Sequence, residues 1–454
     1  MRIRVTILAV VLLASLCAWA SAHRLAQQAP PGTDAALPAG PSQPATESDL
    51  DARIKNFDYS QLADAVDAMP DSADRDYFGG VLANRSGHID ESIGLLNKVL
   101  PGLKSSRPDR ASVALQTLAD DYQKSFRYND AIAAFEDLLH NFASQMDAIE
   151  KHGAEDDYQV TLLLRDAPPQ TISFDGGIDL ATDRTPALGT IETNLTVNGV
   201  TQSWILDTGA NLSTVSASFA AKLGLRLSSG VAETQGATGA ENKLRIAIMP
   251  EMKLGGATIR NVVLLVLDDA SLNIPGGKKT SYQINAILGY PVLEALERIT
   301  FTKDGHFLAG PDSPSGQSGA RLYMDGLTPL LECEVENRKV LFSFDTGADA
   351  SLLSVRYHRD FPDAFKGLRM KHYGMSGAGG AEKLSAYYLP DVQLGVGQTQ
   401  AVLHKVPVVP AMHTDMDLRY GNLGRDLVDP YPSFTLDFES MRFLLGDQIT
   451  AETK

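Results

Sequence analysis

The sequence predicts a multidomain protein in which an N-terminal α-helical repeat region precedes an all-β region of two similar halves. Two observations lead to this prediction. Apolar and small side chains recur at helical spacing over residues 51–155, whereas short strand-like runs and glycine-rich turns fill the chain from 156 onward. In addition, the tetrapeptide Asp-Thr-Gly-Ala occurs twice, at 207–210 and at 345–348, each time after an apolar run. Two copies in matched contexts indicate an internal duplication.

The first 22 residues have the features of a secretory signal peptide. Arg2 and Arg4 provide the basic start, an apolar run extends from Val5 to Leu16, and Ala20-Ser21-Ala22 offers small residues for cleavage. The alternative is an uncleaved membrane anchor, for which this apolar run is short. We therefore expect secretion across the inner membrane, a periplasmic location, and no stable membrane insertion after cleavage.

Composition narrows the classes of function. The chain has 454 residues, 44% of them hydrophobic, and a net charge of −16. Nucleic acid is an unfavourable partner for an acidic protein, because phosphate contacts dominate such binding. Cleavage of the signal leaves only Cys333, so the sequence predicts no internal disulfide and no cysteine metal site. Cys333 lies two residues from both Leu331 and Val335, so in a strand all three side chains share one face, which favours a buried thiol. We expect neither a metal nor an organic cofactor.

Residues 23–50 are rich in Pro, Ala, Ser, Thr and Gln, which predicts a disordered linker. The helical region is expected over 51–155. Its segments 87–93 and 127–132 resemble the start of the second helix of a tetratricopeptide repeat, and a third copy is expected near 58–62. The alternative is a generic helical bundle. The resemblance implies a surface for a protein partner or substrate.

The β region is predicted to form a first lobe over 156–315 and a second over 316–454, with a Pro/Ser/Gly-rich stretch between them. Tyr158 to Leu164 is a strand candidate. Strand-forming side chains occur at every second position over residues 191–197, directly before Asn198-Gly199, and this pattern predicts a hairpin. A short helix is expected over Ser218 to Leu223. Trp204 and Phe342 are expected to be core strand residues.

The two halves match beyond the tetrapeptide. Residues 236–241 (Gly-Ala-Thr-Gly-Ala-Glu) parallel residues 377–382 (Gly-Ala-Gly-Gly-Ala-Glu). Near the end of each half, residues 286–289 (Ala-Ile-Leu-Gly) parallel residues 421–424 (Gly-Asn-Leu-Gly). The shared order predicts two half-sites that face each other.

The repeated aspartates suggest acid–base chemistry. An Asp between an apolar strand and Thr-Gly lies at a sharp turn, where the glycine amide can donate to the carboxylate. If the halves meet, Asp207 and Asp345 would share one proton and hold a water molecule. The ionised member would accept a proton from the water, and the protonated member would donate to the carbonyl oxygen of a peptide bond.

With these motifs the chain resembles the aspartic proteases, and among them the retropepsin-like group. The segment Gly424-Arg425-Asp426 also resembles the one that follows this glycine in retroviral enzymes. The resemblance covers roughly residues 170–450 and implies a two-lobed acid-protease fold. It also implies an enzyme that hydrolyses peptide bonds in peptide or protein substrates. It implies these roles: Asp207 and Asp345 catalytic; Thr208, Gly209, Thr346 and Gly347 supporting the dyad; Gly236, Gly239, Gly377 and Gly380 in flaps that cover the substrate.

The sequence departs from this pattern in two respects. Both lobes lie in one chain, whereas retropepsins pair two short identical chains. Ala210 and Ala348 occupy the position where pepsin-like enzymes usually have Ser or Thr. We hypothesise that the dyad is harder to ionise, which moves activity toward weakly acidic or neutral pH. The alternatives are a catalytically inactive peptide-binding scaffold and a dyad formed between two chains.

Overall fold

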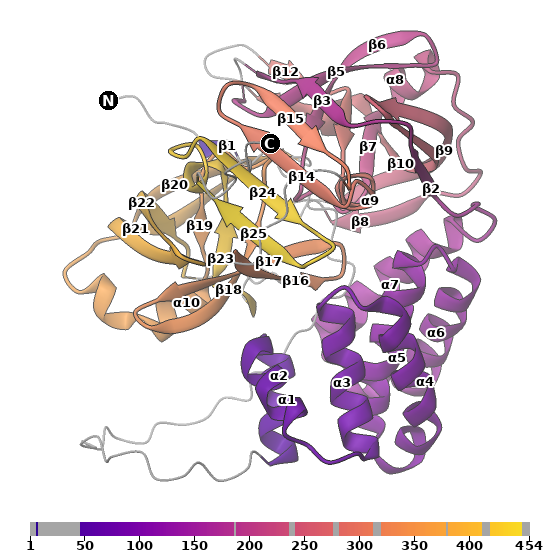
Figure 1. Ribbon diagram of the computed structural model, residues 1–454, viewed down its shortest axis with the longest axis vertical. Coiled ribbons are helices and arrows are strands. Elements are labelled where there is room, and N and C mark those ends of the chain that lie inside the picture. Colours follow the sequence, from indigo (N-terminus) through magenta and orange to yellow (C-terminus); the bar gives the residue numbers. More distant parts are fainter. Residues whose placement is uncertain are drawn as a thin grey trace, which may run out of the picture.

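The computed structural model describes residues 6–7, 46–185, 188–235, 241–275, 281–311, 319–377, 380–410 and 418–446. Helices fill the first part of the described chain and strands fill the rest, which confirms the predicted fold class (Figure 1). The helical region lies beneath two β lobes that sit side by side. No helix in these ranges is long and apolar enough to cross a membrane.

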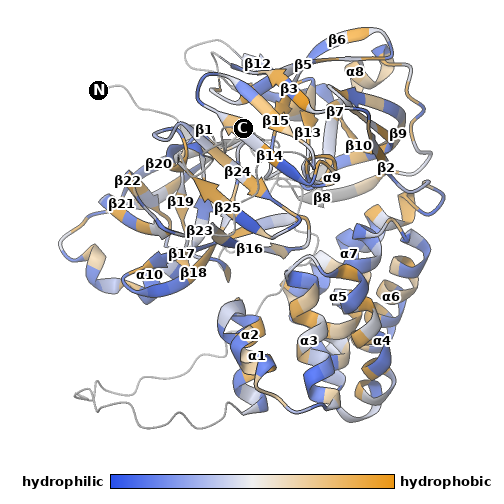
Figure 2. Cartoon of the chain, in the orientation of Figure 1, coloured by the Kyte–Doolittle hydropathy of each residue, from blue (hydrophilic) through white to orange (hydrophobic). Residues whose placement is uncertain are grey.

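The N-terminal region consists of helices that pack in succession, and α3 also contacts α5. Figure 2 shows hydrophobic and hydrophilic residues alternating around α3 to α6, so that each helix presents an apolar stripe to its neighbours. The arrangement as helix pairs agrees with a helical domain; its identity as tetratricopeptide repeats stays a prediction. The helices are α1 (Glu47–Lys55), α2 (Tyr59–Asp67), α3 (Ala73–Arg85), α4 (Ile89–Ser106), α5 (Pro108–Lys124), α6 (Tyr128–Asn141), the 3-10 turn η1 (Ala143–Gln145) and α7 (Ala148–Leu163).

The helical region is longer than its predicted range of 51–155. Helix α1 begins at Glu47, inside the predicted linker, because Thr46 and Asp49 form a capping box. Helix α7 ends at Leu163, so the predicted strand over Tyr158 to Leu164 is wrong. A second capping box, Asp147 with Glu150, starts this helix upstream of the apolar run. A short buried apolar run has the same appearance in a helix and in a strand.

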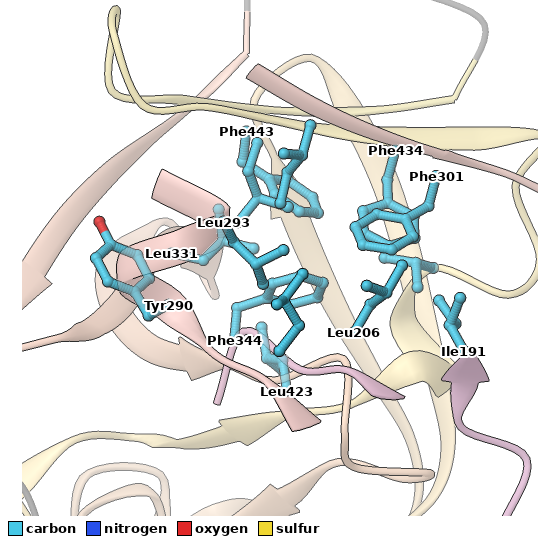
Figure 3. Packing of buried hydrophobic residues seen from close by; sticks show 14 of the residues in the cluster. Ile191, Leu206, Tyr290, Leu293, Phe301, Leu331, Phe344, Leu423, Phe434 and Phe443 are labelled. Atoms are coloured by element: carbon cyan, nitrogen blue, oxygen red, sulfur yellow. The ribbon is translucent and has the colours of Figure 1, made fainter. Parts of the chain in front are cut away.

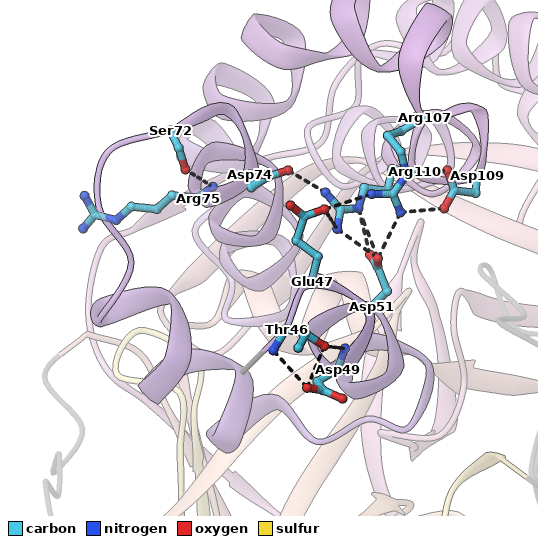
Figure 4. A network of polar contacts seen from close by, with 10 residues as sticks. All are labelled: Thr46, Glu47, Asp49, Asp51, Ser72, Asp74, Arg75, Arg107, Asp109 and Arg110. Carbon is cyan, nitrogen blue, oxygen red and sulfur yellow. Dashed lines mark hydrogen bonds and ion pairs between the residues drawn. The ribbon is translucent and has the colours of Figure 1, made fainter. Parts of the chain in front are cut away.

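A network of ion pairs joins helices α1, α3 and α5 (Figure 4). The buried guanidinium of Arg110 contacts Asp51 of α1 (Nε to Oδ1, 3.0 Å) and Asp74 of α3 (Nη1 to Oδ1, 2.6 Å). Arg107 adds a contact with Glu47 (3.1 Å). Because Arg110 is only 1% exposed, its charge is compensated by these carboxylates rather than by water.

The first lobe contains a nine-stranded sheet in the order β4-β5-β6-β13-β7-β10-β9-β8, with β2 paired to β10, and a separate two-stranded sheet of β11 and β12. Asn198 and Gly199 both have positive φ, 48° and 75°, and close the predicted hairpin between β5 and β6. Its elements are β2 (Thr171–Phe174), β4 (Asp183–Arg184), β5 (Ile191–Val197), β6 (Val200–Leu206), β7 (Ser213–Ser216), α8 (Ala217–Lys222), β8 (Ala232–Gln235), β9 (Glu241–Leu254), β10 (Ala257–Leu267), η2 (Asp269–Leu272), β11 (Asn273–Pro275), β12 (Ser281–Gln283), β13 (Ala286–Leu288) and α9 (Tyr290–Ala295).

The second lobe repeats this plan. Strand β23 lies between β18 and β19, as β13 lies between β6 and β7 in the first lobe. Cys333 of β17 is buried, as expected. The elements are β1 (Thr6–Ile7), β16 (Ala320–Asp325), β17 (Thr328–Val335), β18 (Arg338–Phe344), β19 (Leu352–Leu353), α10 (Val355–Asp360), η3 (Pro362–Phe365), β20 (Lys371–Gly377), β21 (Gly380–Val396), β22 (Thr399–Val408), β23 (Gly421–Leu423), η5 (Arg425–Leu427), β24 (Ser433–Asp437) and β25 (Arg442–Leu445).

Strands from both halves form one continuous stretch of sheet that joins the lobes. The order β3-β15-β14-β24-β25-β16 combines β3 (Ile178–Ala181), β14 (Arg298–Thr302) and β15 (His306–Ala309) with three strands of the second half. At its centre β14 pairs with β24, and the buried hydroxyls of Thr300 and Thr435 lie 2.7 Å apart. This sheet fixes the lobes to each other through backbone hydrogen bonds.

The helical region packs against both lobes. Tyr323, Leu330 and Leu341 of the second lobe belong to the hydrophobic core of the helices, and the Tyr59 and Tyr323 rings lie 5.3 Å apart. Tyr128, Val160 and Leu164, of α6 and the α7 terminus, join a core of the first lobe. A buried carboxylate, Asp325, lies between Arg85 of α3 (3.7 Å) and Arg419 of the second lobe.

Candidate active site

The two aspartates of the repeated tetrapeptide lie on matching turns. Asp207 follows β6 and Asp345 follows β18, and the backbone N–H of each donates to the strand next to it. Asp207 N–H donates to the Leu288 carbonyl at 3.0 Å, and Asp345 N–H donates to the Leu423 carbonyl at 3.0 Å. Strands β13 and β23, which precede Gly289 and Gly424, therefore hold the turns that carry the carboxyl groups.

A hydrophobic core supports these turns from below (Figure 3). Leu206 and Phe344, the residues directly before the two aspartates, pack in one cluster with phenylalanines of the sheet that joins the lobes. The Phe344 ring lies 4.9 Å from Phe443 and 5.8 Å from Phe434. Trp204 and Phe342 are fully buried, as predicted. A close-packed support of this kind limits the movement of the carboxyl groups above it.

The threonines interlock the two turns. The backbone N–H of Thr208 donates to Thr346 Oγ1 (2.9 Å), and Thr208 Oγ1 donates to the Phe344 carbonyl (3.1 Å). The reciprocal bonds run from Thr346 N–H to Thr208 Oγ1 (3.1 Å) and from Thr346 Oγ1 to the Leu206 carbonyl (2.8 Å). Four buried hydrogen bonds thus fix the spacing between the lobes at the level of the carboxyl groups.

The glycines allow the carboxyl groups to approach each other. Gly209 N–H donates to Asp207 Oδ1 at 2.9 Å, and Gly347 N–H donates to Asp345 Oδ1 at 2.7 Å. A Cβ atom at Gly209 would lie 2.5 Å from Asp345 Cγ, closer than any real contact of that kind. Asp345 therefore reaches across the interface and lies against the turn that carries Asp207.

Burial and proximity make both carboxyl groups hard to ionise. Asp207 is 0% exposed and Asp345 is 1% exposed. Burial, and after it the charge of Asp345, raises the pKa of Asp207 well above its usual range. Burial also raises the pKa of Asp345, against the hydrogen bonds that it accepts. The two groups are expected to titrate as a pair that holds one proton between them. Both belong to one chain, so the dyad is not built between two chains in this structure.

The sequence pattern of one protein family, aspartyl protease, matches residues 193–292, which include the turn that carries Asp207. This part of the chain is similar to the aspartyl proteases. No curated protein sequence matches the chain. Among solved structures, a retropepsin-like aspartic protease from Rickettsia conorii is 23% identical, with a TM-score of 0.23, over 32% of this chain and 96% of its own. Conglutin gamma from lupine seeds (10% identical, TM-score 0.37) and basic 7S globulin from soybean (11%, 0.36) each match 59% of this chain and 94% of their own.

The residues predicted to form substrate flaps are described in the second lobe only. Gly377 ends β20 and Gly380 begins β21, and the two residues pair at the tip of a long hairpin. In the first lobe β8 and β9 pair from Gln235 and Glu241 outward, and Gly236 and Gly239 lie outside the described residues. The hairpins have the same place in the two lobes. Their role as substrate flaps stays a prediction.

Residues to which the sequence assigned no role also shape the candidate site. Buried Arg425 donates from Nη1 to the carbonyls of Thr346 (3.0 Å) and Gly347 (3.2 Å), and from Nη2 to Leu188 of the first lobe (3.1 Å). It therefore connects the turn that carries Asp345 with the other lobe. The Gly424-Arg425-Asp426 motif was the signal for this residue. Asn422 donates to Asp345 Oδ2 at 3.3 Å, and no sequence motif predicts this contact.

If the site cleaves peptides, replacing Gly209 with Ala is expected to reduce the cleavage about a hundredfold, because the new methyl group displaces the Asp345 carboxyl. The measurement is kcat/KM on any peptide that the wild type cleaves. Gly94→Ala is the matched control, since that helical position has open space around it. Equal activity of Gly209→Ala and wild type would show that the close approach is not needed for catalysis.

Proposed function

We propose that this protein is an exported aspartic endopeptidase that hydrolyses peptide bonds with a water molecule held between Asp207 and Asp345. The observation that supports the proposal is the pair of buried carboxyl groups on turns interlocked by Thr208 and Thr346. Neither a metal nor an organic cofactor is needed in this mechanism. The signal-like first 22 residues support a periplasmic location.

The proposed reaction uses the shared proton of the dyad. The ionised carboxylate accepts a proton from water as the water oxygen attacks the scissile carbonyl carbon. The protonated carboxyl donates to the carbonyl oxygen as negative charge develops there. In the second half of the reaction the leaving nitrogen gains a proton, the C–N bond breaks, and the dyad returns to one proton.

The substrate is proposed to be a peptide or protein segment bound in an extended form between the lobes and beneath the β20–β21 hairpin and its counterpart. Exposed strand edges can pair with such a segment through its backbone, and side-chain pockets then select its sequence. The helical region is proposed to bind a protein partner or the substrate itself.

The test is incubation of a peptide library with the purified protein between pH 3 and 8, followed by mass spectrometry of the products. Defined cleavage sites are expected. Peptides that bind but are never cut would contradict the proposal and favour the alternative of a catalytically inactive peptide-binding scaffold. The Asp→Asn variants treated in the Discussion exclude a contaminating protease.

A further inference from the structure

The two carboxyl groups of the dyad have unequal surroundings. Asp345 Oδ1 accepts from the backbone N–H groups of Gly347 (2.7 Å) and Ala348 (3.1 Å), and Asp345 Oδ2 accepts from Asn422 Nδ2 (3.3 Å). Asp207 Oδ1 accepts from Gly209 N–H (2.9 Å). Burial raises the pKa of Asp207, but a backbone hydrogen bond from Ala210 also acts to lower it, as that from Ala348 does for Asp345. The two lobes therefore differ in the side-chain donor Asn422. In the described part of the chain, no donor reaches Asp207 Oδ2 apart from the proton that the dyad shares. Hydrogen bonds to a carboxylate favour its charged form, so the difference favours ionisation of Asp345.

The side-chain donor comes from a pair of residues that differs between the lobes. Asn422 of β23 pairs in register with Ser343 of β18, two residues before Asp345. At the matching places of the first lobe, Ile287 of β13 pairs with Ile205 of β6, two residues before Asp207. All four side chains are at most 3% exposed. Asp345 thus has a polar pair beside it, whereas Asp207 has an apolar pair at the matching place.

Ser343 fixes the orientation of the Asn422 amide. The Ser343 hydroxyl donates to Asn422 Oδ1 at 2.6 Å, which leaves Nδ2 directed at Asp345 Oδ2. If the Asn422 amide were rotated by half a turn, its Oδ1 would lie against Asp345 Oδ2, and the two oxygens would repel each other when Asp345 is ionised. Buried polar groups need partners, and both ends of this amide have one. The pair therefore supplies a fixed donor to the carboxylate.

We propose that Asn422, oriented by Ser343, is a positioning residue that makes Asp345 the ionised member of the dyad and Asp207 the protonated one. Asp345 then accepts the proton from water, and Asp207 donates to the carbonyl oxygen of the substrate. This inference rests on the proposed function. It also revises the expectation drawn from Ala210 and Ala348, because Asn422 supplies from another strand one of the donors that those residues lack.

Arg425, from the segment after β23, is a charged group that interacts with Asp345, and its other charged neighbours are Asp349, from the loop after β18, Arg184 and Asp429. None of these groups is altered when Ser343 and Asn422 are replaced. A change in the titration of the dyad in such variants therefore reports the polar pair.

The test is the double variant Ser343→Ile/Asn422→Ile, which gives the second lobe the pair that the first lobe already packs. The acidic limb of the kcat/KM–pH profile is expected to move up by about one unit, with an approximately tenfold loss of kcat/KM on that limb. In ¹³C NMR of the labelled aspartate carboxyls, the lower pKa of the dyad is expected to rise by the same amount. Ile205→Val/Ile287→Val, which changes packing but no polar group, is expected to shift neither quantity.

Asn422→Leu alone, which keeps the size of the side chain, serves as the second variant if the double variant does not fold. An unchanged pH profile together with an unchanged NMR titration would overturn the inference. If the wild type cuts no peptide but the NMR pKa still rises in the variants, the proposed function fails and the assignment of the ionised carboxyl stands. The two ideas can therefore fail separately.

Discussion

Replacing either Asp207 or Asp345 with Asn is expected to lower kcat/KM for a cleaved peptide by about a thousandfold or more. Asn has nearly the shape of Asp, but a dyad with one carboxyl group cannot both accept a proton from water and donate one to the carbonyl oxygen. The measurement is kcat/KM under the pH conditions where the wild type is most active. Both variants should lose activity to a similar degree, because the two groups act as a unit.

The same variants should gain stability at neutral pH. The pKa of Asp207 is raised in the folded protein above its unfolded value of about 3.9. The unfolded chain therefore releases its proton first as pH rises, and the free energy of unfolding falls from about pH 4 up to the raised pKa. Asp207→Asn lacks this titration. Its free energy of unfolding should decline less between pH 4 and 7 than that of the wild type, measured by urea titration.

Asp391→Asn is the matched control for the cleavage measurement. This aspartate is exposed, lies on β21 and pairs with His404 at the surface. Its replacement should not change cleavage. Full activity in Asp207→Asn or in Asp345→Asn would remove that carboxyl from the mechanism. Recovery of activity on mixing the two inactive variants would show that dyads also form between chains.

Replacing Asp325 with Asn is expected to destabilise the protein by about 3–5 kcal/mol at pH 7. Its carboxylate, 2% exposed, lies between the guanidinium groups of Arg85 and Arg419, each 1% exposed. Removal of the negative charge leaves two buried positive charges facing each other. The measurement is urea unfolding, followed by helical circular dichroism and by the fluorescence of buried Trp204.

Asp71→Asn is the control for this substitution. Asp71 pairs with Arg75 on the surface of the helical region, and its side chain is 96% exposed. Its loss should change stability by less than about 1 kcal/mol. If Asp325→Asn lowers the free energy of unfolding no more than the control does, the buried ion group between α3 and the second lobe does not contribute the proposed stability.

The sequence was sufficient to predict the dyad and its threonine interlock, because these depend on one short repeated motif. The tight turn at Asn198-Gly199 and the buried strand at Trp204 were likewise local and correct. The strand predicted over Tyr158 to Leu164 was wrong because a short apolar run is compatible with both a strand and a buried helix. Only the upstream capping box at Asp147 and packing against the first lobe decide for a helix there.

Long-range partners could not be predicted in this way. Asp325 meets Arg85 and Arg419 only after three parts of the chain have folded together. Asn422 reaches Asp345 because β23 lies beside β18 in a particular register. The sequence aligned Asn422 with Ile287, but it gave no reason to place the asparagine at the carboxylate. Such contacts follow from topology, which a single sequence specifies only indirectly.

The continuous sheet that joins the lobes has a consequence for how a peptide can lie in the site. Two identical chains related by a twofold axis present the same residues on both sides of a dyad, so both orientations of a bound peptide are equivalent. Here one side carries Ser343 and Asn422, and the other carries Ile205 and Ile287. For a peptide bound as proposed, the N-to-C direction is then expected to matter, because the surroundings of the two aspartates differ in a way that a symmetric pair of chains cannot have.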